Sequence, residues 1–181
     1  MRAADVQTAK YRLYRGDSPK VMAEFAENSI DCVVTSPPYG VAKEYETNDP
    51  AKQLAELLAL LDAAFCQFAR TVRPGGYVFV NFGDNAFGKR IDGTETLTTV
   101  PMAIHYYPLG QKYGLELQAT RIWRKRFATM KFPFALNSHP RPVFDYEHLW
   151  TWRKPDGTGK EVVRDHKISR RGVWDTSSYT D

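Results

Sequence analysis

Residues Thr35-Ser36-Pro37-Pro38-Tyr39 bring together three chemical features directly after the apolar run at residues 30–34. Ser36 supplies a hydroxyl and Tyr39 an aromatic ring. The two prolines hold the backbone in one shape, because neither has an N–H and both fix φ. A hydroxyl and a backbone carbonyl held in a rigid turn can accept hydrogen bonds without reorganisation. A plain strand-ending turn is the alternative interpretation of the prolines alone.

The elements around this turn alternate between strand and helix patterns. Ser18 is a suitable N-cap with Pro19 in the first helical position. From Pro50 onward, leucines and phenylalanines recur at helical spacing until Pro74-Gly75-Gly76 breaks the pattern. The expected order is strand 11–15, helix 18–29, strand 30–34, helix 50–72 and strand 77–84. Such a βαβαβ order predicts a parallel sheet with right-handed crossovers.

The second half of the chain predicts a different arrangement. Residues 85–99 resemble a loop, and residues 100–113 predict a short helix interrupted near Pro108. Alternating residues at 146–154 predict an antiparallel edge strand that pairs with a strand at 115–125. Residues 126–145 show no regular pattern, and residues 155–181 are polar and predict a loop-rich tail. Length and composition predict one α/β domain over residues 1–181.

Positive charge is concentrated late in the chain. Residues 1–120 hold 12 Lys and Arg against 14 Asp and Glu, whereas residues 121–171 hold 13 against 5. Aromatic residues are interspersed with this basic segment, which suits a partner lined with phosphates. The alternative is a solvated basic face beside ordinary core aromatics. Within the segment, the candidate DNA contacts are Lys125, Arg126, Lys131 and Arg141, with 126–145 as a DNA-contacting loop.

Cysteine, histidine and hydropathy patterns exclude several classes of protein. Cys32 and Cys66 lie in apolar runs without metal-binding spacing, which predicts small buried side chains and no disulfide framework. The four histidines show no metal-ligand or triad spacing and are assigned structural or surface roles, so no metal site is expected. Without a signal-peptide core or a long apolar stretch, we expect a cytoplasmic protein that does not enter a membrane.

Several motifs together resemble the amino-methylating DNA methyltransferases of the β, or permuted, arrangement. The motifs are Gly16-Asp17-Ser18, Thr35-Ser36-Pro37-Pro38-Tyr39, "RPGGYVFVNFGD" at 73–84, "IWRK" at 122–125, "YEHLWTWRK" at 146–154 and "GVWD" at 172–175. These enzymes methylate cytosine N4 or adenine N6 in DNA, as in restriction–modification systems. The resemblance implies a partial doubly wound, Rossmann-like sheet, mostly parallel with an antiparallel edge hairpin.

The resemblance also implies roles for particular residues. The Ser36 side chain and the Pro37 carbonyl would accept hydrogen bonds from the target amine, with Pro38 stiffening the turn. Tyr39 would stack on the flipped base. Asp17, Ser18 and Thr35 would contact the cofactor, S-adenosyl-L-methionine, although Asp17 is also a plausible helix-capping residue. Asn81 and Asp84 lie toward the carboxyl end of the strand at 77–84 and are weaker candidates for the same cleft.

One family feature is missing from these residues, because no glycine-rich loop follows a strand. The resemblance therefore implies a catalytic half, completed by a second polypeptide or by self-association. A truncated form and an inactive relic that still binds double-stranded DNA are the alternatives. Serine at position 36 favours cytosine N4 over adenine N6, again by resemblance.

Overall fold

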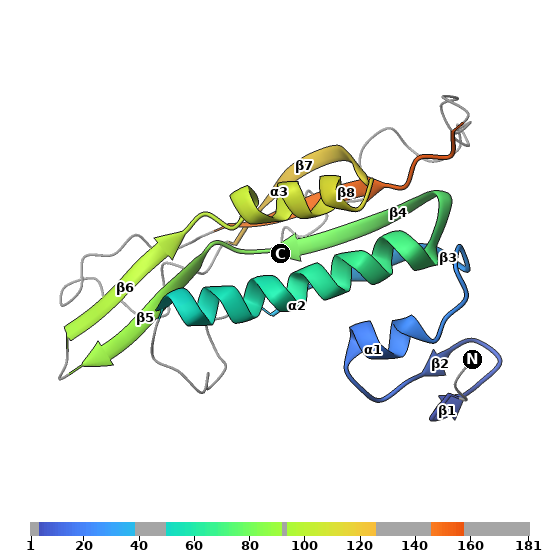
Figure 1. Cartoon of the computed structure of the whole chain (residues 1–181), viewed down its shortest axis with the longest axis horizontal. Helices are drawn as coiled ribbons and strands as arrows, with labels where there is room; N and C mark the ends of the chain where they lie inside the picture. The colour runs from blue at the N-terminus through green and yellow to red at the C-terminus, as the bar shows by residue number, and fades with distance from the viewer. Residues whose placement is uncertain (1–3, 39–49, 92–93, 126–145, 158–181) are drawn as a thin grey trace, which may run out of the picture.

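The computed structural model describes residues 4–38, 50–91, 94–125 and 146–157. Its central element is a four-stranded mixed sheet in the order β3-β4-β8-β7 (Figure 1). The strands are β3 (Ile30–Thr35), β4 (Val72–Phe82), β7 (Glu116–Arg124) and β8 (Tyr146–Arg153). β3 runs parallel to β4, whereas β8 is antiparallel to both of its neighbours, β4 and β7. The predicted antiparallel pairing of the two late strands is therefore confirmed.

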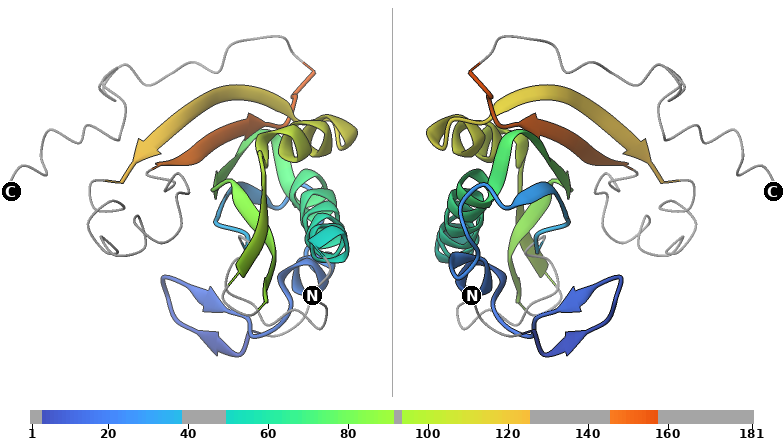
Figure 2. Two further views of the ribbon diagram at one scale, coloured as in Figure 1. Left: turned by 90° about the vertical axis from the view of Figure 1, so that its left-hand side faces the viewer. Right: turned by 90° about the vertical axis from the view of Figure 1, so that its right-hand side faces the viewer.

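Helices α2 (Pro50–Thr71) and α3 (Ala103–Lys112) cover the same face of this sheet (Figure 2). The apolar stripe of α2 packs on alternate residues of β4 and β8, as its helical spacing predicts. Lys112 Nζ and Asp62 Oδ1 join the two helices at 2.6 Å, and this hydrogen bond lowers the pKa of the Asp62 carboxyl. The buried core comprises Leu57, Leu61, Phe65, Phe68, Val72, Val78, Val80, Phe82, Met102, Tyr106, Leu115, Trp150 and Trp152.

Two glycines permit close approaches that a side chain would block. A Cβ on Gly76 would lie 2.6 Å from the carbonyl oxygen of Asp31, so glycine is needed where β4 passes β3. A Cβ on Gly110 would lie 2.3 Å from the Trp152 ring, which is fully buried beneath α3. The sheet and its helical layer therefore fit together through positions that carry no side chain.

The N-terminal region differs from the sequence-based prediction. The strand predicted at 11–15 is only Arg12–Leu13 (β2), and it pairs antiparallel with Val6–Gln7 (β1) outside the main sheet. Helix α1 (Ser18–Ala23) is capped by Asp17, not Ser18, and ends well before residue 29. The backbone leaves the helix after Ala23 and adopts a left-handed conformation at Asn28, where φ is 57°. Only β3 and β4 form the parallel pair within the described residues.

Three further predictions are wrong. Residues 85–99 do not form a loop, because β5 (Asn85–Ile91) and β6 (Thr94–Val100) pair as an antiparallel hairpin. Pro108 does not interrupt α3, which continues around it as one helix. Strand β8 is not an edge strand but lies between β4 and β7, because its Trp150 and Trp152 belong to the core.

Residues on the second face of β3 are exposed. Cys32, predicted to be buried, is exposed, and Val34 is 78% exposed on the same face. An apolar run on an edge strand does not require burial of both faces, which is why the prediction for Cys32 was wrong. Among the described helices, none combines the length and apolar character needed to cross a bilayer.

We predict that Gly110→Ala lowers the free energy of unfolding by about 1–3 kcal/mol, the usual effect of overpacking a core. The added methyl group would overlap the Trp152 ring, which has no room to move. Chemical denaturation monitored by circular dichroism would measure the change. Gln111→Ala, at the adjacent exposed position of the same helix, is the control and should be nearly neutral. Equal stability of the two variants would contradict the packing of Trp152 against α3.

Candidate active site

The parallel register of β3 and β4 brings Ser36 to Asn81. Thr35, the last residue of β3, is paired with Val80 of β4. One residue further along each strand, Ser36 Oγ donates a hydrogen bond of 3.1 Å to Asn81 Oδ1. Ser36 is exposed, whereas Pro37 beside it is buried and anchors the turn. The Ser36 hydroxyl is thus oriented while its oxygen remains accessible from solvent.

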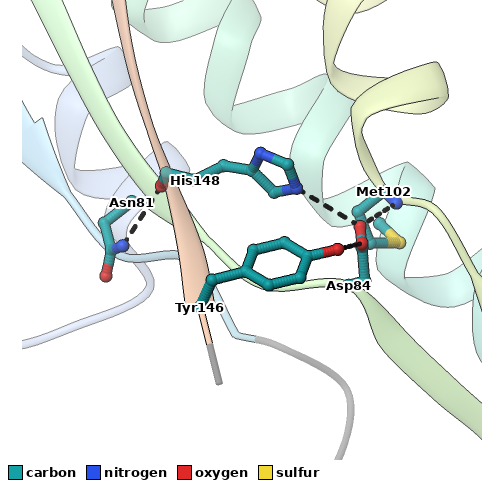
Figure 3. Close-up of polar contacts among 5 residues, drawn as sticks. All are labelled: Asn81, Asp84, Met102, Tyr146 and His148. Carbon is teal, nitrogen blue, oxygen red and sulfur yellow. Dashed lines mark hydrogen bonds and ion pairs between the residues drawn. The ribbon is translucent and has the colours of Figure 1, made fainter. Parts of the chain in front are cut away.

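Asn81 is itself held by a third strand. Its Nδ2 donates 3.2 Å to the backbone carbonyl of His148 in β8 (Figure 3). Because one end of the carboxamide donates to His148 and the other accepts from Ser36, its orientation is fixed. The orientation of the Ser36 hydroxyl therefore depends on how β3, β4 and β8 are placed relative to one another.

Asp84, beyond the end of β4, organises a second group of contacts (Figure 3). Its Oδ1 accepts from the backbone N–H of Met102, the N-cap of α3, at 2.9 Å. Its Oδ2 accepts from the hydroxyl of Tyr146, the first residue of β8, at 2.9 Å. With a side chain only 10% exposed, this carboxylate ties together the starts of α3 and β8.

The His148 ring completes this group. It stacks on Phe82, with ring centroids 4.8 Å apart, and its Nε2 lies 3.6 Å from Asp84 Oδ1. Nε2 is buried and makes no hydrogen bond to any described residue. The sequence predicts a structural or surface role for His148, and its buried ring, stacked on Phe82, has a structural role. Its alternation with Trp150 and Trp152 was the available signal for an inward-facing ring.

Within the described residues, no hydrogen bond or ion pair links Asp17 or Ser18, the predicted cofactor residues, to Ser36. Asp17 Oδ1 accepts from the Lys20 N–H at 3.3 Å and caps α1, the alternative role that the sequence left open. Asp17 Oδ2 has no hydrogen-bond donor among the described residues, and the side chain is exposed. Capping therefore leaves one carboxylate oxygen accessible to a ligand.

The remaining predicted residues divide between described and undescribed parts of the chain. Thr35 and Pro38 are half-buried beside Ser36 and the buried Pro37. Tyr39, Arg126, Lys131 and Arg141 lie outside the described residues. No group of three or more His, Cys, Asp or Glu side chains within the described part of the chain could hold a metal ion.

Lys125, a predicted DNA contact, makes contacts within the protein. Its ammonium forms an ion pair with the buried carboxylate of Glu147 and lies 5.8 Å from the centre of the Trp123 ring. Burying Glu147 without a cation would be costly, so this lysine has a structural task. Its charge is already balanced before any partner binds.

A mixed sheet with polar side chains at the shared carboxyl end of its parallel strands is the arrangement that doubly wound proteins use to bind ligands. The sheet order β3-β4-β8-β7, with the Ser36-Pro37-Pro38 turn at this edge, is consistent with the Rossmann-like class of methyltransferases. A family model described as DNA methylase matches residues 30–176, and the chain belongs to that family. Its members methylate amino groups with S-adenosyl-L-methionine as the cofactor.

Curated relatives agree with this assignment. The chain is 27% identical over 176 residues to the Type II beta methyltransferase M.BslI of Bacillus sp. (strain NEB-606). It is 26% identical over 146 residues to the Type II methyltransferase M.BglII of Bacillus subtilis. The alignments include 91% and 80% of this chain but only 18% and 36% of the relatives, so the chain spans a minor part of their length.

Solved structures show the same fold. A putative DNA modification methylase from Thermus thermophilus, complexed with S-adenosyl-L-methionine, superposes with a TM-score of 0.60 at 28% identity. The match covers 86% of this chain and 58% of that one. The cytosine-N4-specific PvuII DNA methyltransferase, at 19% identity, has a TM-score of 0.57 over 80% of this chain and 49% of its own.

We predict that Asp84→Ala lowers the free energy of unfolding by about 1–3 kcal/mol, because it leaves the Met102 N–H and the Tyr146 hydroxyl without their acceptor. Thermal or urea denaturation would measure this loss. Asp31→Ala is the matched control. Asp31 is 86% exposed and pairs with Arg73 at the surface, so its loss should cost less than about 1 kcal/mol. A larger loss in the control would contradict the central position of Asp84.

Proposed function

We propose that this chain is the catalytic part of a DNA methyltransferase that methylates the exocyclic amine of a base flipped out of the duplex. The observation that carries the proposal is the hydrogen bond from Ser36 to Asn81 at the carboxyl end of β3. A base amine needs an acceptor for its N–H groups at this position. Ser36 is oriented to be that acceptor by a neighbour that belongs to a different strand.

The direction of this hydrogen bond supports an acceptor role. An exocyclic amine is a weak nucleophile, because its lone pair is delocalised into the aromatic ring. Since the Ser36 hydrogen is donated to Asn81, the lone pairs of Oγ remain available to the amine. The Pro37 carbonyl is the second proposed acceptor. Together these groups would draw the nitrogen toward tetrahedral geometry and free its lone pair.

Asn81 is not suited to act as a general base. A carboxamide has no basic site near neutral pH, so Asn81 orients Ser36 without taking its proton. Transfer of a methyl group from bound S-adenosyl-L-methionine to this nitrogen would leave the amine positively charged. The proton it then loses passes to solvent, which the exposed position of Ser36 permits.

S-adenosyl-L-methionine supplies the methyl group when bound. The proposed contacts are Asp17, Ser18 and Thr35, and their fit rests on the free Oδ2 of Asp17. An exposed carboxylate oxygen that is not used by the helix cap can accept hydrogen bonds from an adenosyl group. Thr35 lies next to Ser36, so a contact there would place cofactor and base on adjoining residues.

For the nucleic acid, we propose cytosine N4 as the target in preference to adenine N6. Serine at position 36 supports this choice through the family resemblance. Tyr39 is the proposed stacking partner of the flipped base. Double-stranded DNA is the proposed substrate, with Arg126, Lys131 and Arg141 as backbone contacts. Lys125 is a weaker contact than the sequence predicted, because Glu147 already neutralises its charge.

We also propose that the sheet is completed by protein from outside residues 1–181, either a second polypeptide or a second copy of this chain. The support is the outer edge of β3, which pairs with no other described strand. Val34 on this strand is 78% exposed. An open apolar edge strand favours association with another strand. A second polypeptide would also bring the glycine-rich part of the cofactor site, whereas a second copy of this chain would only cover the strand.

We predict that Ser36→Ala lowers kcat about 10²–10³-fold in the completed enzyme, the usual effect of removing one preorganised polar group. Transfer of tritiated methyl groups to DNA would measure it. Ser29→Ala is the control, because the Ser29 hydroxyl bonds only to the Ala26 carbonyl at the surface. Full activity of Ser36→Ala would remove Ser36 from the mechanism.

For Tyr39, we predict that replacement by alanine costs about 1–3 kcal/mol of base stacking, while replacement by phenylalanine is mild because the ring is kept. Binding of DNA that carries a mismatched target base would report stacking apart from chemistry. If alanine and phenylalanine at position 39 gave the same affinity, the ring would have no stacking role.

The purified 181-residue chain alone is predicted to show no methyl transfer, and mixing with a completing polypeptide should restore it. A large, obligate-type interface of roughly 2,000 Å² or more is expected for such a partner. The assay uses tritiated S-adenosyl-L-methionine, with sedimentation to report self-association. Robust transfer by the monomeric chain would refute the need for a partner but not the methyltransferase activity.

A further inference from the structure

A row of residues leads from Ser36, just beyond the end of β3, across β4, β8 and β7. Asn81, to which Ser36 donates, is paired with Leu149 of β8. Leu149 is in turn paired with Arg121 of β7. Directly paired residues on neighbouring strands project from the same face of a sheet. Arg121 is therefore on the face that carries Ser36 and Asn81, opposite the helices.

Arg121 is an exposed and uncompensated charge at the far end of this row. Its side chain makes no ion pair or hydrogen bond to the residues that the structure describes, in contrast to Lys125, which is paired with Glu147. Strand spacings of about 4.8 Å put Arg121 roughly 14 Å from Ser36 across three intervals. The guanidinium can extend from there toward the backbone of a nucleic acid whose base lies at Ser36.

Trp123 adds an aromatic surface beside this charge. It is paired with Glu147, two residues from the Leu149 position, so its ring lies on the same face as Arg121. It is 48% exposed, whereas Trp150 and Trp152 are buried in the core on the opposite face. An exposed indole next to an exposed guanidinium combines stacking with phosphate recognition, the pairing used by proteins that bind unpaired nucleotides.

We propose that Arg121 and Trp123 bind the DNA strand that carries the target base, Arg121 through a phosphate and Trp123 by stacking on an unpaired base. This inference rests on the proposed function, since it extends the site around Ser36 across the sheet to strand β7. The charge of Arg121 and the negative backbone of DNA are complementary. The occupant is a nucleic acid strand, because an exposed cation and an exposed indole on the face of Ser36 match the phosphates and the bases of such a strand.

Arg124 of the same strand is a matched control. It is paired with Tyr146, one residue away from the position of Glu147, and therefore projects from the opposite, helix-covered face. Arg121 and Arg124 have the same charge, strand and exposure class. The two arginines project from opposite faces of the sheet, so a comparison of them separates a directed contact from general electrostatic attraction.

The test is fluorescence anisotropy of labelled duplex and single-stranded oligonucleotides with the full chain over a series of salt concentrations. Arg121→Ala should lower the log–log salt slope by about 0.7–0.9, the loss of one phosphate contact, and Arg121→Lys should retain it. Trp123→Ala should weaken binding to single strands about five- to 150-fold, and Trp123→Phe less. Arg124→Ala should change the slope little.

The outcomes separate this inference from the function on which it rests. If the wild-type chain binds DNA and Arg124→Ala lowers the slope as much as Arg121→Ala, the catalytic-face contact is refuted while the proposed function stands. Unchanged binding of both Arg121→Ala and Trp123→Ala refutes it as well. If the wild-type chain binds no DNA, alone or with its completing protein, both the contact and the proposed function fail. Circular dichroism confirms that each variant is folded.

Discussion

The parallel pairing of β3 with β4 is the constraint on which the rest of the site depends. Parallel strands end at the same edge of a sheet, so the two chain segments that follow them meet there. Pairing of Thr35 with Val80 sets the contact between Ser36 and Asn81. The pairing in turn requires Gly76, since any side chain at that position would strike the Asp31 carbonyl.

Burial and chemistry are divided between the two faces of the sheet. Val78, Val80, Trp150 and Trp152 face the helices and provide the apolar burial that stabilises the fold. The alternate residues of each strand face the other way, and these include Asn81, between Val80 and Phe82, in the row of Ser36. Alternation along a strand thus allows the face that carries Ser36 and Asn81 to hold polar groups without weakening the core.

Strand β8 links the turn at Ser36-Pro37-Pro38, through Asn81, to residues more than 100 positions later in the chain. The backbone of His148 holds Asn81, while its ring stacks on Phe82 and approaches Asp84. Asp84 holds Tyr146 at the start of the same strand. Since Asn81 bonds to Ser36, a change in the placement of β8 would alter the orientation of the Ser36 hydroxyl through the Asn81 carboxamide. The family assignment is consistent with this dependence, because the matched residues 30–176 span both β3 and β8.

The sequence by itself determined the local elements with strong periodicity and the family. The stripe of α2, the apolar β3 and the antiparallel pairing of β7 with β8 follow from side-chain spacing, and the motif around Ser36 carries the resemblance. Short or weakly patterned segments were predicted less well. The β5–β6 hairpin depends on long-range pairing, and the continuity of α3 through Pro108 depends on packing against Trp152.

Only the tertiary structure decided which polar residues act together. Asn81 and Asp84 are cleft candidates from the sequence, because they stand at the end of a predicted strand, whereas no spacing links His148 or Arg121 to Ser36. They meet because strand order and register are set by the burial of whole strands against the helices. Local sequence specifies which residues alternate on one strand. Which strands become neighbours depends on the packing of the complete core, and no single segment of the sequence specifies that packing.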